Sequence, residues 1–436
     1  MFAVGLSPAG TDTPDRRSVT AMSGSSSPVD RSTPPAGQPT GPLAGLRVLE
    51  LGQLLAGPFA ATLLAWFGAD VIKVEPPGTG DPLRNWRALY KGTALWWLVM
   101  GRNKRSVTAN LREPEGRDLV RGLAKHCDVL IENFRPGRLE AWDLGEEALR
   151  EINPRLIVVR VSGWGQTGPY APKPGYASVA EGAGGLRYVS GFPDRPPVRA
   201  NLSLGDTIAG LHAALGALAA VYHRDGPAGG RGQVVDVAIY ETILNLMEST
   251  VPELDKLGLV RERQGAKLSG IAPSNTYQCR DGRYVIIGGN GDSIFRRLMT
   301  AAGRDDLASD VRLVHNDGRV AHEPEIDAAL SAWTESLTFD EVMAALDRAE
   351  VPAGPIYSVA DQVRDPHFQA RGVVERVPIG DDDSVLLPTL APRFSETPGS
   401  TAWPGPALGA HNDDVYGRLL GLDGERLADL RTRGII

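Results

Sequence analysis

The chain has little cysteine, no long apolar run and no excess of basic residues. Its 436 residues include two cysteines, Cys127 and Cys279, which are far apart and match no metal-ligand spacing. We therefore expect reduced thiols in a cytoplasmic protein that holds no metal. No apolar run approaches the roughly 18 residues of a membrane span, and the net charge of −7 argues against a general nucleic-acid binder. Neither a membrane nor a nucleic acid is expected as a partner.

The N-terminal segment lacks the apolar centre of a signal peptide. Residues 1–41 are instead rich in Ser, Thr, Pro and Gly. Such a composition cannot form a packed core, so we expect a disordered tail. Met22 is an alternative start of the protein.

From residue 42 onward, short apolar runs alternate with helical patterns. Strands are expected at 47–51, 71–75, 106–111, 128–131, 156–161 and 233–239, with helices such as 59–67, 114–125, 146–152 and 240–257 around them. This alternation predicts an α/β fold with a doubly wound parallel sheet. Residues 259–355 depart from it, because Asp281-Gly282 predicts a hairpin and amphipathic helices follow. We expect a large domain from 42–258 and 356–436, with a smaller α+β domain at 259–355 inserted between the two parts.

The loops that follow the strands are the expected ligand positions of such a sheet. The first loop, 52–58, lacks the three-glycine dinucleotide fingerprint, which disfavours a nicotinamide or flavin cofactor. Cations and an aromatic residue occur in later loops, at 102–106, at Arg112 and at 132–138. Together they suit a ligand with several phosphates and a flat base, whereas each cation alone is as compatible with a solvated surface.

One carboxylate, Asp206, precedes a long run of small and apolar residues at 207–222. The run predicts a helix that is buried on most sides. Asp206 would then be either an N-cap that accepts hydrogen bonds from the helix start or a nucleophile kept ionised by the positive helix end. The local pattern alone is compatible with both roles.

Several segments, in a fixed order, resemble the class III coenzyme A transferases, the relatives of formyl-CoA transferase and carnitine CoA-transferase. They are residues 43–51, 56–58 (Ala-Gly-Pro), 68–75 (Gly-Ala-Asp-Val-Ile-Lys-Val-Glu), 103–106 (Asn-Lys-Arg-Ser), 132–137 (Glu-Asn-Phe-Arg-Pro-Gly), 204–206 (Leu-Gly-Asp), 230–236 (Gly-Arg-Gly-Gln-Val-Val-Asp) and 408–411 (Leu-Gly-Ala-His). The resemblance extends from about residue 42 to the C-terminus. It implies a large domain built from both chain ends, an inserted small domain, and a homodimer of interlocked subunits.

The resemblance implies that Asp206 attacks the acyl carbonyl of a CoA thioester to form an anhydride and then an aspartyl-CoA thioester. A carboxylic acid would then receive the CoA. We expect an acyl-CoA such as succinyl-CoA as the donor. Arg187, in the stretch 182–188, and Arg199 offer cations for a distal carboxylate, which favours the hypothesis of a dicarboxylic acid as the acceptor. Coenzyme A is thus expected as part of a substrate, with no permanently bound cofactor. The positions that resemble the family's CoA-binding residues, together with two nearby cations, are Leu55, Ala56, Arg105, Ala109, Arg112, Asn133, Phe134, Arg135 and Lys173.

The chain departs from the family pattern at several places. Pro76 stands where an arginine is frequent, so Arg102 or Arg105 would have to supply a phosphate contact. Ala410 replaces an acid in the C-terminal motif, and Ser269-Gly270 replaces the glycine-rich lid.

Two alternatives to a transferase remain. An α-methylacyl-CoA racemase has the same fold but uses a His-Asp pair where this chain has Tyr176-Ala177, and proton exchange at a carbon needs acid/base groups on both faces. The other alternative is a CoA-binding protein without catalysis, which the presence of Asp206 disfavours. Glu181, one helical turn beyond Ala177, is either a structural glutamate or a substitute for the acid that some transferases have at position 177.

Overall fold

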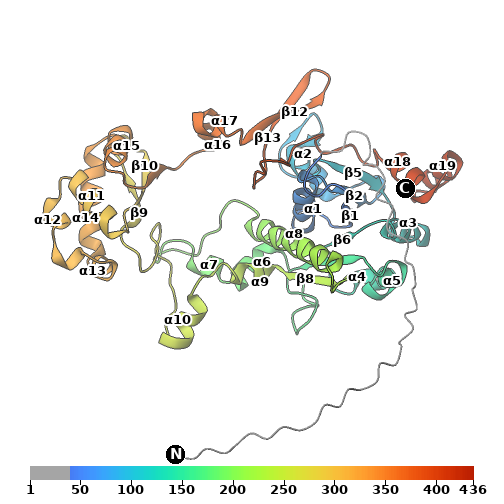
Figure 1. Cartoon of the computed structure of the whole chain (residues 1–436), viewed down its shortest axis with the longest axis horizontal. Coiled ribbons are helices and arrows are strands. Elements are labelled where there is room, and N and C mark those ends of the chain that lie inside the picture. Colours follow the sequence, from blue (N-terminus) through green and yellow to red (C-terminus); the bar gives the residue numbers. More distant parts are fainter. Residues whose placement is uncertain (1–39) are drawn as a thin grey trace, which may run out of the picture.

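The computed structural model describes residues 40–436, and its larger part is built around a six-stranded parallel sheet (Figure 1). Neighbouring strands are parallel throughout, in the order β5-β2-β1-β6-β7-β8. The order proceeds outward in both directions from the β1–β6 pair, so the predicted doubly wound sheet is confirmed, with its topological switch between these two strands. The strands are β1 (Arg47–Glu50), β2 (Asp70–Glu75), β5 (Lys104–Thr108), β6 (Val129–Glu132), β7 (Ile157–Ser162) and β8 (Val234–Ala238).

Helices cover both faces of the sheet. Successive strand residues point to opposite faces, so each strand contributes side chains to both layers of helices. Val48 belongs to the apolar cluster formed with α1 and α8, and its neighbour Leu49 to the cluster formed with α3 and the C-terminal helices. The helices of this region are α1 (Ala56–Trp66), α3 (Pro114–Ala124), α4 (Arg138–Ala141), α5 (Glu146–Ile152), α6 (Ala177–Ala183), α7 (Leu186–Val189), α8 (Leu204–Asp225), α9 (Ile239–Leu244) and α10 (Thr250–Leu257).

The C-terminal residues pack on the parallel sheet again, although residues 274–355 separate them in the sequence from the first part of this region. Helix α18 (Asn412–Leu420) packs on α3 and β5, and α19 (Gly424–Thr432) adds Leu427 and Leu430 to the cluster on that face. The core around the parallel sheet is therefore built from both parts of the chain. The remaining elements here are a 3₁₀ helix (Pro82–Asn85), β3 (Leu89–Tyr90), β4 (Thr93–Ala94), α2 (Leu95–Met100), α16 (Val359–Arg364), α17 (Pro366–Ala370), β12 (Val374–Gly380) and β13 (Asp383–Pro388).

Residues 274–355 form a separate group of elements with its own buried cluster. Three antiparallel strands, β9 (Ser274–Gln278), β10 (Tyr284–Gly288) and β11 (Ala353–Pro355), pack against helices at one end of the molecule (Figure 1). The helices are α11 (Asp292–Ala301), α12 (Asp305–Ala308), a 3₁₀ helix (Val311–Leu313), α13 (Asn316–Ala321), α14 (Glu323–Ser336) and α15 (Phe339–Arg348). The predicted hairpin around Asp281-Gly282 is confirmed by the pairing of β9 with β10.

Two expectations are modified by the structure. The single helix expected at 240–257 is wrong, because α9 ends at Leu244 and α10 begins at Thr250, with Glu248 at a positive φ of 51° between them. In the described part of the chain, α8 is long and apolar enough to span a membrane, but it packs against α1, β7 and β8. The expected tail at 1–41 and the alternative start at Met22 lie outside the described residues, except for positions 40 and 41.

Candidate active site

A cleft of about 670 Å³ opens at the carboxyl ends of the parallel strands. It lies at the switch between β1 and β6, where the loops after these strands diverge and leave a crevice. Its lining comes from residues 53–56, 86–87, 96, 133–135, 161–163, 175–178, 199–203, 206 and 239. Segments far apart in the sequence thus meet where α8 begins.

Asp206 lies in the first turn of α8 and faces this cleft. The position before the helix is occupied by Ser203, and no side chain caps the helix start. The proposed N-cap role of Asp206 is therefore wrong. The carboxylate instead remains available to a molecule in the cleft.

The surroundings of Asp206 raise its affinity for a proton. Partial burial and the nearby Glu181 raise the pKa of Asp206 to about 6, while Arg199 acts in the opposite direction. The positive end of α8 acts in the same direction as Arg199 and favours the ionised form. A pKa raised in this way keeps more of Asp206 protonated at mildly acidic pH than is the case for a free aspartate.

The first loop, which contains Leu55 and Ala56, is held by a buried charge network. Leu54 has a positive φ of 64°, and its N–H donates to the Asp81 carboxylate at 3.1 Å. Lys73 contacts Asp81 at 2.9 Å and Glu50 at 2.7 Å. Burial lowers the pKa of Lys73, but Asp81 and Glu50 more than offset this and raise it. The network fixes a strained backbone conformation at the edge of the cleft.

The turn after β6 supplies Asn133, Phe134 and Arg135, and all three line the cleft. The Asn133 side chain accepts from the Gln53 N–H and donates to the Gln53 carbonyl oxygen, each at 2.8 Å. It therefore joins the loops after β1 and β6. Phe134 packs edge-on against Trp142. Arg135 is the cationic side chain that this turn contributes to the lining of the cleft.

Four other predicted ligand-binding residues do not line the cleft. Arg105 is buried and paired with Asp70 and Asp414. Ala109 and Arg112 follow β5 at the far edge of the sheet. Lys173 lies over the ring of Tyr170, 3.7 Å from its centroid.

The predicted cationic loop at 102–106 is wrong as a loop. Residues 104–108 are strand β5, and Arg102 is buried, donating to the carbonyl oxygens of Val99 and Pro388. Burial, together with the neighbouring Lys73, lowers the pKa of Lys104 to about 8, although Glu50 acts in the opposite direction. The charged groups of Arg102 and Lys104 are therefore buried and bind partners inside the protein.

Trp86, Arg87 and Trp96 line the cleft as well, although they were not identified from the sequence. The Arg87 guanidinium lies over the Trp96 ring at 4.1 Å from its centroid. The Trp86 and Trp96 rings are tilted by 43° to one another, with their centroids 6.4 Å apart. Together with Arg87 they offer aromatic and cationic surface that suits a planar or anionic group. Their only signal was the density of Arg and Trp between residues 84 and 97.

Tyr176 and Ala177, which depart from the family pattern, line the cleft with Asp206, whereas two other departures lie outside its lining. Gly270 belongs to the segment before β9, and its carbonyl oxygen accepts from Asn316 at 2.9 Å. Ala410 precedes His411, whose ring nitrogen Nδ1 accepts from the Ser106 N–H at 3.1 Å. Neither Gly270 nor Ala410 lines the cleft.

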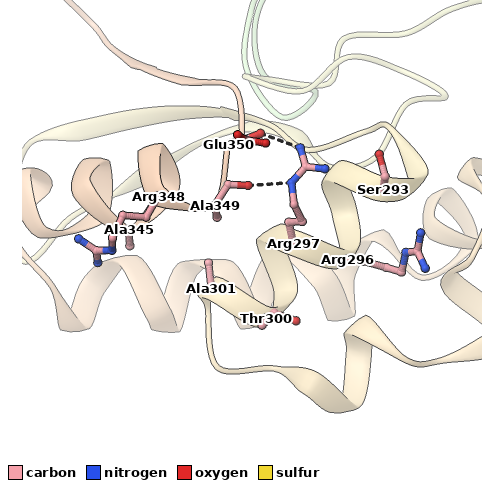
Figure 2. Close-up of a pocket in the computed structure, with 9 residues that line it drawn as sticks. All are labelled: Ser293, Arg296, Arg297, Thr300, Ala301, Ala345, Arg348, Ala349 and Glu350. Carbon is pink, nitrogen blue, oxygen red and sulfur yellow. Dashed lines mark hydrogen bonds between the residues drawn. The ribbon is translucent and has the colours of Figure 1, made fainter.

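A second hollow, of about 690 Å³, lies between α11 and α15 (Figure 2). The Arg297 guanidinium donates to the carbonyl oxygens of Ala349 and Glu350, at 2.7 and 2.8 Å. Gly291 precedes α11, and Asp292 in the first turn of this helix pairs with Arg319 at 2.9 Å. The one carboxylate lining this hollow, that of Glu350, belongs to an exposed residue, so the sheet cleft is the better candidate for chemistry.

Comparison with known proteins identifies the family. Residues 43–412 match the model of CoA-transferase family III. The chain is 50% identical over 400 residues to the succinyl-CoA–D-citramalate CoA-transferase of Chloroflexus aurantiacus, covering 92% of this chain and 99% of that protein. It is 42% identical over 399 residues to the beta subunit of the succinyl-CoA–L-malate CoA-transferase of the same organism, covering 91% and 98%.

A solved structure agrees with these relatives. The CAIB/BAIF family protein from Brucella suis superposes with a TM-score of 0.77 at 36% sequence identity, covering 87% of this chain and 100% of that chain. Both the sequence matches and the fold therefore extend across nearly all of the described residues. The chain belongs to CoA-transferase family III.

Proposed function

We propose that this enzyme transfers CoA from succinyl-CoA to a second dicarboxylic acid. The observation that carries the proposal is a half-buried carboxylate, Asp206, in a cleft at the topological switch of the sheet. The succinyl-CoA-dependent relatives, at 50% and 42% identity, support the donor and the class of acceptor.

In the proposed first half-reaction, an Asp206 oxygen attacks the carbonyl carbon of succinyl-CoA. The C–S bond breaks, CoA leaves as a thiolate, and Asp206 becomes one half of a mixed anhydride. The thiolate then attacks the Asp206 carbonyl carbon, and succinate leaves with its electron pair. Asp206 is now a CoA thioester, and no net proton transfer has occurred.

The second half-reaction reverses these steps with the acceptor. An acceptor carboxylate attacks the Asp206 thioester and displaces the thiolate, which then attacks the acceptor's carbonyl carbon and regenerates the free aspartate. Because no step needs an added acid or base, a single carboxylate suffices. Exclusion of water is essential, since hydrolysis of either intermediate would dissipate the thioester's free energy.

We propose that CoA lies along the carboxyl edge of the sheet. From β5 to β7 this edge spans roughly 19 Å at the usual spacing of about 4.8 Å between strands. The phosphates would lie towards Ala109 and Arg112, the pantetheine arm against Leu55 and Ala56, and the thioester at Asp206. The turn at 133–135 would contact the middle of the molecule. Arg105 and Lys173 lie outside this path.

For the acceptor we propose that Arg199 holds the distal carboxylate. Arg199 lines the cleft with Asp206, and its side chain is 42% exposed. Arg187, the other cation considered for this role, does not line the cleft and pairs with Glu181 at 3.0 Å. The structure therefore favours Arg199.

We further propose a cytoplasmic homodimer in which residues 259–355 act as a small inserted domain. An apolar stripe along α8, consisting of Leu211, Leu215 and Tyr222, is exposed. These residues lie at helical spacing on one face. Exposed apolar faces of this kind are typical of subunit interfaces, and light scattering on the purified protein measures the oligomeric state directly.

A panel of acceptors tests the proposed function. The enzyme is incubated with succinyl-CoA and either a dicarboxylic acid, such as citramalate, malate or glutarate, or a monocarboxylic acid, and new thioesters are identified by mass. We expect new CoA esters of dicarboxylic acids. A racemase would instead exchange deuterium at the α-carbon of a 2-methylacyl-CoA without forming a new thioester, and a non-catalytic protein would do neither.

A further inference from the structure

Glu181 is a buried acid next to the cleft. It lies in α6, is 2% exposed, and packs where α6 meets the first turn of α8. The position of a Cβ built on Gly205 would be 3.1 Å from the Glu181 Cγ. Glycine at 205 therefore allows this glutamate to approach the helix start directly before Asp206.

The two carboxylate oxygens of Glu181 have different partners. Oε1 accepts from the backbone N–H of Gly205 at 3.2 Å. Oε2 pairs with Arg187 at 3.0 Å and with Arg199 at 3.4 Å. One side chain thus connects the backbone next to Asp206 with the cation that lines the cleft.

We propose that Glu181 is a positioning residue that fixes Arg199 opposite Asp206, so that the cleft selects an acceptor with a second carboxylate. Arg199 precedes α8 in a segment that belongs to neither a helix nor a strand. A side chain in such a segment has several conformations available, and the ion pair with Glu181 restricts it. This inference rests on the proposed function, whose nucleophile and acceptor class it assumes.

The charges around Asp206 are consistent with this arrangement. Glu181 and Arg199 act on its carboxylate in opposite directions. Other charged groups on neighbouring elements have partners elsewhere: Arg160 of β7 pairs with Glu132, Asp236 of β8 accepts from the Gln166 N–H, and Glu241 of α9 accepts from Tyr240. Helix α1, which also packs on α8, contains no charged residue.

Substitution of Glu181 by Gln separates positioning from simple packing. The glutamine oxygen can still accept from Gly205, but its amide cannot form an ion pair with Arg199. We expect the KM for the dicarboxylic acceptor to rise about tenfold. The KM for a monocarboxylic acceptor should change by less than about twofold, since it makes no use of the distal contact.

Arg187→Gln is the matched control, because it removes the other partner of the same Glu181 oxygen without touching the cleft. We expect it to retain the preference for dicarboxylates. An equal loss of this preference in Arg187→Gln and Arg199→Gln, or a Glu181→Gln enzyme whose two KM values change in parallel, overturns the inference.

The pH profile gives a second measurement on the Glu181→Gln enzyme. Removing the negative charge should move the acid limb of kcat/KM to lower pH, an effect that loss of packing would not produce; an unchanged or raised limb contradicts the inference. Glu181→Ala serves to show whether the hydrogen bond to Gly205 is needed for folding. CoA transfer that persists in Asp206→Ala would contradict the proposed function itself. The Asp206→Ala result therefore separates a failure of the proposed function from a failure of the inference about Glu181.

Discussion

Replacing Asp206 by Asn should stabilise the protein while removing its chemistry. The fold favours the protonated carboxyl, because partial burial and Glu181 raise its pKa from about 3.8 to about 6. This difference corresponds to at most about 3 kcal/mol, and solvent screening of a half-buried group reduces it to about 1–2 kcal/mol. Asparagine has a similar shape and no charge, so it avoids the cost of ionisation.

The sign of the pH dependence follows from linkage. Below the unfolded pKa, wild-type Asp206 is protonated in both states, and the two proteins should have similar stability. As the pH rises from about 4 to about 6, the unfolded chain loses this proton while the folded wild type keeps it, so the stability of the wild type falls relative to Asp206→Asn. The stability gap should therefore open between about pH 4 and 6 and stay constant above.

Thermal or urea unfolding of both proteins across this pH range measures the gap. Asp306→Asn is the control with the opposite expectation, because Arg304 lowers the pKa of the exposed Asp306 to about 2. An Asp206→Asn protein that is less stable than the wild type at pH 8 would refute the reasoning. It would show that the helix end and Arg199, rather than burial and Glu181, dominate the environment of Asp206.

Three further results are expected. The kcat/KM for succinyl-CoA should rise between pH 5 and 7 with a midpoint near 6, because only ionised Asp206 attacks; a flat profile contradicts this. Gly210→Ala should lower the free energy of unfolding by about 1–2 kcal/mol, because its Cβ would be 2.9 Å from the Ala56 carbonyl oxygen. Gly182→Ala is the control and should be neutral or stabilising, because its Cβ would have no atom within 4 Å. Equal changes in the free energy of chemical unfolding for the two variants contradict the packing argument. Arg135→Gln should raise the KM for succinyl-CoA about tenfold with little change in kcat; an unchanged KM removes Arg135 from the CoA site.

The parallel sheet could be predicted from the sequence because its signal is local. Apolar runs such as Val71-Ile72 and Val129-Leu130-Ile131 are typical of strands buried on both faces. The break at Glu248 could not be predicted in the same way. A positive φ at a glutamate has no local sequence signal, so the pattern around it still favoured one continuous helix.

The candidate site was only partly predictable, because the sequence does not show where a cation points. Arg105 was expected to contact a phosphate, but it pairs with Asp414, which is 309 positions away. Such a partner is visible only in three dimensions. Asn133 was expected to bind CoA. The structure adds a second role that the sequence did not show, because its side chain joins the loops after β1 and β6 through two hydrogen bonds with Gln53.

The measurement that tests the central claim most directly is chemical trapping of the intermediate. The enzyme is incubated with succinyl-CoA, treated with borohydride or hydroxylamine, digested and examined by mass spectrometry. An activated Asp206 should be reduced to the alcohol or converted to the hydroxamate, at that residue alone and only when succinyl-CoA is present. Modification of another carboxylate, or full CoA transfer by an Asp206→Ala enzyme, would contradict the account.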